Sequence, residues 1–68
     1  MRFEIIRTDI NKIVVKPMEF DSAERAAGEY ICLLTLAGVL KSADDYTHDG
    51  GDRYTLKNGW KIEVRPAQ

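Results

Sequence analysis

The stretch SAERAAGEYICLLTLAGVLK, residues 22–41, decides the fold, because its apolar residues recur at helical spacing. Asp21 or Ser22 can accept a hydrogen bond from a free amide of the first turn, so the pattern predicts one helix over this range. The first half is amphipathic, whereas in residues 31–40 only Thr35 is plainly polar. One sheet cannot bury apolar residues on every side of a helix, so we expect the second half to need a further cover.

Two glycines, Gly28 and Gly38, interrupt this segment. Glycine inside a helix costs roughly 1 kcal/mol relative to alanine. We therefore interpret both glycines as places where another backbone comes close. The alternative for Gly38 is that the helix ends before it and that this glycine caps the helix.

Two β-rich segments, RFEIIR at 2–7 and KIVVK at 12–16, precede the helix, and residues 8–11 form the turn of a predicted hairpin. Proline cannot donate a ladder hydrogen bond, so the second strand should end near Pro17 or lie at a sheet edge. Alternation divides the apolar residues between the two faces. Phe3, Ile5, Ile13 and Val15 are predicted on the inner face, and Ile6 and Val14 on the outer one.

The residues after the helix predict a polar loop over 42–52 and a second hairpin from strands 53–56 and 60–65. A two-residue turn would put Tyr54 and Leu56 on the face opposite Trp60. A three-residue loop that ends with Gly59 in the left-handed conformation keeps these side chains on one face. We therefore predict the three-residue loop.

The resulting order is ββαββ, which favours a single two-layer α+β domain over residues 1–68. Its four-stranded, mainly antiparallel sheet would carry one long helix across one face. This order of elements is similar to that of β-grasp folds, which include the small immunoglobulin-binding bacterial domains. The resemblance concerns architecture alone and implies no function.

Composition limits the classes of function. A chain of 68 residues has a small core and marginal stability alone, so it often relies on another subunit. The single cysteine, Cys32, excludes a disulfide within the chain, and charges at Arg2, Glu4 and Arg7 interrupt any secretory leader. The apolar stretch over 30–40 is shorter than the about 20 residues of a membrane-spanning helix. We therefore expect a cytoplasmic protein with no membrane segment.

The densest polar cluster is the acidic loop, in which His48 also lies. Residues 45–50 resemble the opening of an EF-hand-type calcium loop, but Leu56 occupies the position where that loop needs a bidentate glutamate. We predict no metal site and no cofactor. The acidic residues are instead expected to meet a basic partner, and they are Asp44, Asp45, Asp49 and Asp52.

Cys32 and His48 are the one pair that a nucleophile and its base could use. Cys32 is expected in the middle of a helix, far from the helix N-terminus that would activate a thiol, so we read it as a small apolar residue. The chain also has no phosphate-binding loop. We therefore predict that the protein is not an enzyme.

The remaining signal is apolar and favours a protein partner. We interpret the chain as an interaction module that occupies a partner surface, as a small inhibitor or adaptor does, including those that phages and mobile elements encode against host enzymes. It is expected to form a homodimer or small oligomer through the second half of the helix. The predicted interface residues are Ile31, Leu34, Thr35, Gly38 and Val39.

The alternative is a small nucleic-acid-binding protein that uses a basic outer sheet face. The aromatics weigh against it, because Tyr54 and Trp60 alternate with the core and would not be free to stack on bases. The basic residues that can share that face are Arg2, Lys12, Lys16, Arg53, Lys61 and Arg65.

Overall fold

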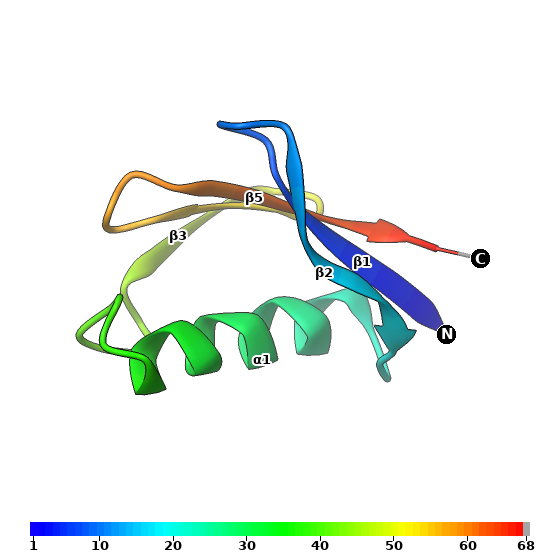
Figure 1. Ribbon diagram of the computed structural model, residues 1–68, viewed down its shortest axis with the longest axis horizontal. Coiled ribbons are helices and arrows are strands. Elements are labelled where there is room, and N and C mark those ends of the chain that lie inside the picture. Colours follow the sequence, from blue (N-terminus) through cyan, green and yellow to red (C-terminus); the bar gives the residue numbers. More distant parts are fainter. Residues whose placement is uncertain (68) are drawn as a thin grey trace.

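A computed structural model describes residues 1–67. In this range the elements are β1 (Arg2–Arg7), β2 (Lys12–Glu19), α1 (Ala23–Leu36), β3 (Tyr46–Gly50), β4 (Arg53–Leu56) and β5 (Lys61–Pro66). The strands form one sheet in the order β2-β1-β5-β4-β3, and every neighbouring pair is antiparallel. The helix α1 lies across one face of the sheet (Figure 1). The prediction of a two-layer α+β domain is therefore confirmed.

The predicted strand count is wrong, because residues 46–50 form the additional strand β3 within the expected loop. The extra strand reverses the chain once more before the last strand. The last strand, β5, runs antiparallel to β1. The observed ββαβββ order differs from the ββαββ order on which the similarity to β-grasp folds rested.

Strand β2 contains two register shifts that alter which side chains face the core. Ile5 pairs with Val15 and Ile6 pairs with Ile13, so Val14 is an extra residue in β2. This bulge turns Val14 toward the core and leaves Ile13 on the outer face, 49% exposed, so both predicted sides are wrong. Ile6 lies on the outer face as predicted.

The helix begins as predicted and ends earlier. At its start, the Ser22 hydroxyl accepts a hydrogen bond from the Arg25 amide at 3.1 Å. At its end, Gly38 adopts a φ of 81°. The Val39 amide donates to the Leu34 carbonyl at 2.9 Å, which completes a glycine-capped terminus. The alternative that the helix ends before Gly38 is confirmed.

The hairpin of β4 and β5 has the predicted three-residue loop. Gly59 has a φ of 96°, and Tyr54 pairs with Ile62. The Leu56 amide donates to the Trp60 carbonyl at 2.7 Å, which closes the loop. The apolar residues of both strands therefore face α1.

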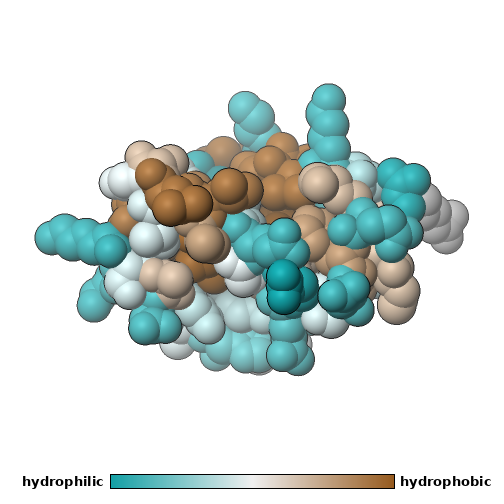
Figure 2. All heavy atoms as spheres, turned by 90° about the horizontal axis from the view of Figure 1, so that it is seen from below, coloured by the Kyte–Doolittle hydropathy of each residue, from teal (hydrophilic) through white to brown (hydrophobic). Residues whose placement is uncertain are grey.

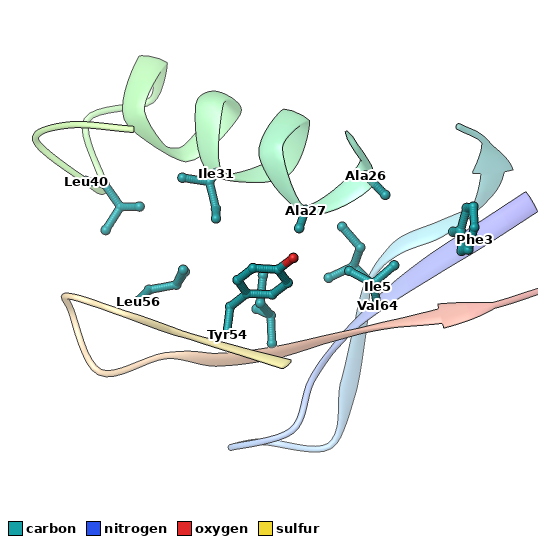
Figure 3. Packing of buried hydrophobic residues seen from close by; sticks show 10 residues of the cluster. Phe3, Ile5, Ala26, Ala27, Ile31, Leu40, Tyr54, Leu56 and Val64 are labelled. Carbon is teal, nitrogen blue, oxygen red and sulfur yellow. The ribbon is translucent and has the colours of Figure 1, made fainter. Parts of the chain in front are cut away.

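The core lies between α1 and the sheet (Figure 3). After the helix cap, the chain turns Leu40 back into this layer, where it is 4% exposed. The β1–β5 pairing crosses the middle of the sheet, and at its end the Ala67 amide donates to the Arg2 carbonyl at 2.8 Å. The helix is too short to span a bilayer. The buried cluster consists of Phe3, Ile5, Ala26, Ala27, Ile31, Leu40, Tyr54, Leu56, Ile62 and Val64.

Candidate interaction surfaces

The helix covers only the centre of the sheet. Its main contacts are with β1 and β5, so both edge strands extend beyond it. A groove runs along each side of α1, one toward β2 and one toward β3. The two grooves differ in chemistry.

The groove between α1 and β2 is apolar. Its walls include Val15 and the half-buried Phe20 and Tyr30, and its volume is about 90 Å³. This is well below the roughly 300–1,000 Å³ of a small-molecule site, so the groove has room for one anchoring side chain. Met18 and Leu33 also line it and are 53% and 61% exposed, and Leu36, one turn further along α1, is 79% exposed. We call Met18, Phe20, Tyr30, Leu33 and Leu36 the apolar surface.

Figure 2 views the molecule from the side of α1 and shows hydrophobic residues gathered in the upper part of this face. Hydrophilic residues border them, and the lower part of the face mixes hydrophilic residues with residues of intermediate hydropathy. Large exposed apolar side chains that lie next to one another are unusual on a monomer, because a contiguous patch commonly marks an interaction site.

The five predicted helix interface residues lie in different environments. Ile31 is a core residue that is 2% exposed, and Leu34 and Thr35 are half-buried. Gly38 caps the helix, and Val39 is 40% exposed. Sequence reasoning did not single out the exposed Leu33 and Leu36, because residues 31–40 are apolar apart from Thr35 and do not show which side of the helix faces the core.

The predicted acidic loop is divided by β3. Asp44 and Asp45 lie before the strand, where the Asp45 side chain accepts a hydrogen bond from the Ser42 amide at 3.1 Å. Asp49 and Asp52 lie at the opposite end of the strand. There, Asp49 accepts a hydrogen bond from the Thr55 hydroxyl. The four carboxylates therefore flank an edge strand and do not form one cluster.

No group of three or more metal-ligating side chains converges within residues 1–67. Cys32 lies on the exposed side of α1. His48 lies on β3, and its Nε2 is within 2.6 Å of the Gly51 carbonyl oxygen, to which it donates.

The groove between α1 and β3 has an aromatic floor. The rings of His48 and Tyr54 are stacked with centroids 4.6 Å apart, and Tyr46 meets Tyr54 edge-on at 5.7 Å. The helix contributes Glu24 and Gly28 to the opposite wall. Burial raises the pKa of Tyr54, and the nearby charge of Glu24 raises it further. We call this the aromatic groove; the sequence pattern did not indicate it.

The basic residues of the sheet do not form a continuous positive face. Arg65 forms an ion pair with Glu63 at 3.0 Å and lies opposite Glu4, and Arg53 lies opposite Glu63. Lys12 is the register partner of Arg7 in β1, and Arg7 is also the register partner of the core residue Ile62 in β5. Directly paired residues lie on the same face of a sheet, so Lys12 lies on the face that carries α1, not on the predicted outer face. Carboxylates thus alternate with cations on the outer face. Arg2, Lys16 and Lys61 are exposed.

A polar cluster joins the turn between β1 and β2 to the turn between β4 and β5. Arg7 donates through Nε to Asp9 at 3.2 Å, and its guanidinium lies 3.9 Å from the centroid of the Trp60 ring. The Lys61 amide donates to the same Asp9 carboxylate at 3.3 Å. The hydrogen bond from Arg7 lowers the pKa of Asp9 below its ordinary value. These contacts hold the turns together.

Comparisons of the chain with protein-family models, with curated proteins and with solved structures find no match.

Proposed function

We propose that this chain is a non-enzymatic interaction protein that acts by occupying a partner surface and that pairs with a second copy of itself through the apolar surface. The observation that carries the proposal is the exposure of Leu33 and Met18, which line the same groove, and of Leu36 one turn further along α1. A domain of this size has few apolar residues to spare, and leaving large ones in water forgoes roughly 1.5–3 kcal/mol each.

The shape of the apolar surface supports a second copy as its occupant. A two-fold interface uses the same patch on both subunits, so the patch must contain both a projecting group and a recess. Leu36 projects, with 79% of its surface exposed, and the groove lined by Phe20 and Leu33 is the recess. The five residues of the apolar surface are uncharged, and Glu29, the one carboxylate that lines the groove, is ion-paired with Arg25 at 3.1 Å.

The test is the solution mass of the chain across a concentration series, measured by light scattering or sedimentation. We expect a dimer whose mass falls to that of the monomer in Leu36→Glu, because the variant places a charge in the interface. Ile10→Glu is the matched control, since Ile10 is 51% exposed in the first hairpin turn, away from α1.

Two outcomes would overturn the proposed self-pairing. One is a monomer at every concentration. The other is a dimer that survives both Leu33→Glu and Leu36→Glu, because that dimer would use a different surface. Circular dichroism of each variant establishes that the fold is retained.

A further inference from the structure

The two edges of the sheet are protected to different degrees. Edge strand β2 contains Pro17, two register shifts and the lysines Lys12 and Lys16, all of which discourage another strand from pairing with it. Edge strand β3 has neither proline nor lysine, and its one irregularity lies at its end, between His48 and Gly50. Of the two edges, β3 is the one open to pairing.

The backbone of β3 has unused hydrogen-bonding groups. The Lys57 amide donates to the Asp45 carbonyl at 2.8 Å, and Thr47 is the register partner of Thr55. Successive residues of an antiparallel strand direct their backbone groups to opposite sides. Tyr46 and His48 therefore direct theirs away from β4. The Tyr46 amide donates to the Asp44 carbonyl at 2.9 Å, so among residues 1–67 the Tyr46 carbonyl and both backbone groups of His48 have no partner and can pair with an added strand.

Gly28 lies on the same side of the molecule as β3. It lies inside α1 and lines the aromatic groove, and a Cβ built on it would meet no atom within 4 Å. Glycine is among the least favourable residues in a helix, and no contact within residues 1–67 requires it here. A residue that breaks a local rule without a packing reason is a candidate for function. Its missing side chain keeps the groove open beside Tyr46 and His48.

The charge around β3 determines the occupant. Residues 42–52 carry four aspartates and no lysine or arginine, and Glu24 lines the aromatic groove. Arg53 and Lys57, at the two ends of neighbouring β4, are the basic residues nearest to β3, so acidic groups outnumber basic ones there. Two β3 strands pairing antiparallel would bring Asp44 of one copy near Asp52 of the other, which disfavours a second copy at this edge. A strand with lysine or arginine side chains would instead gain ion pairs along the edge and cation–π contacts over the Tyr46 and His48 floor.

We propose that β3 is the docking edge for a basic, extended segment of a partner protein, which joins the sheet as an added strand and places one side chain in the aromatic groove. This inference rests on the proposed function, and it states which surface of the interaction protein binds the target. The apolar surface on the other side of α1 remains available to the second copy. One subunit can therefore engage both.

The test is a titration with a capped ten-residue peptide in which lysine alternates with threonine. The comparison peptide has glutamate in place of every lysine. Salt is set near 0.15 M, where the Debye length is about 8 Å and long-range attraction is screened. We expect the lysine peptide alone to bind and to slow amide hydrogen exchange at His48. Threonine is included because it favours extended backbone.

Two variants locate the binding site. Gly28→Gln fills the aromatic groove with a better helix former and should weaken binding about tenfold or more. Glu29→Gln places the same side chain beside the opposite, apolar groove, and we expect it to change the affinity by no more than about twofold. A melting temperature of Gly28→Gln at or above that of the unmodified chain shows that lost binding is not lost folding.

The proposal is overturned if Gly28→Gln binds as tightly as the unmodified chain, if His48 gains no protection, or if the glutamate peptide binds equally. Repeating the titration with Leu36→Glu separates the two proposals. Peptide binding by that variant supports the β3 edge whether or not the chain pairs with itself. Failure of the lysine peptide with both chains refutes the docking edge and leaves the self-pairing test unaffected.

Discussion

Replacing Gly28 and Gly38 by alanine should change the stability of the fold in opposite directions. At Gly28 the helix is regular and an added Cβ meets nothing within 4 Å. Alanine should therefore raise the free energy of unfolding by about 1 kcal/mol. At Gly38 there is also open space, but the φ of 81° is a left-handed conformation that costs a residue with a Cβ about 1–2 kcal/mol.

Thermal unfolding followed by circular dichroism measures both effects. For a domain of this size 1 kcal/mol corresponds to about 4–8 °C, so Gly28→Ala should melt about 4–8 °C higher and Gly38→Ala about 4–16 °C lower. The whole fold is expected to be stable by about 3–10 kcal/mol, so both variants remain folded. All chains are compared at one concentration, because self-association makes the melting temperature depend on it.

Either of two results would refute this reasoning. A lower melting temperature for Gly28→Ala would mean that the side chain meets an obstacle there and that the groove is not open. An unchanged or higher melting temperature for Gly38→Ala would mean that the helix continues through this residue, as the helix predicted over residues 22–41 would do.

Three further changes test the cap, the core and the turn cluster. Ser22→Ala removes the side-chain acceptor of the Arg25 amide and should lower the free energy of unfolding in urea by about 1 kcal/mol; no change would mean that water replaces the cap. Ile31→Ala leaves a cavity under α1 and should cost about 2–5 kcal/mol, against about 0.5–1.5 for Ile31→Val; equal costs would contradict its burial. The pKa of Asp9 is lowered from 3.8 by Arg7, so its stabilisation is present above that value and is lost as the pH falls through the lower folded pKa. Asp9→Asn should therefore flatten the fall in melting temperature between about pH 5 and about pH 2, and an unchanged slope would refute the assignment.

The second hairpin and the start of the helix could be predicted because local chemistry determines them. Only a three-residue loop with Gly59 at its end keeps Tyr54 and Trp60 on one face, and Ser22 is a strong cap signal. The end of the helix was open to two interpretations. Gly38 serves equally as a helix interruption or a cap, and tertiary packing of Leu40 decides between them.

Strand β3 was missed because its residues are polar and all of them are exposed. One signal was available, since Gly50-Gly51 is a common hairpin turn and Tyr46, Thr47 and His48 tolerate extended backbone. The bulge at Val14 has no such signal, because alternation alone cannot reveal an inserted residue. Missing β3 also hid the aromatic groove, whereas the acidic residues that flank it were visible in the sequence.

The antiparallel pairing of β1 with β5 also governs how this chain can fold. Its register pairs Phe3 with Pro66, which are separated by nearly the full length of the chain. The same pairing holds the centre of the sheet together. During synthesis β5 is the last strand to emerge, so the first hairpin and the helix wait without their central neighbour. Such distant pairing slows folding, because a long loop must close before the contacts form. A circular permutant that joins Ala67 to Met1 through a short linker would make this pairing local, and it should fold faster.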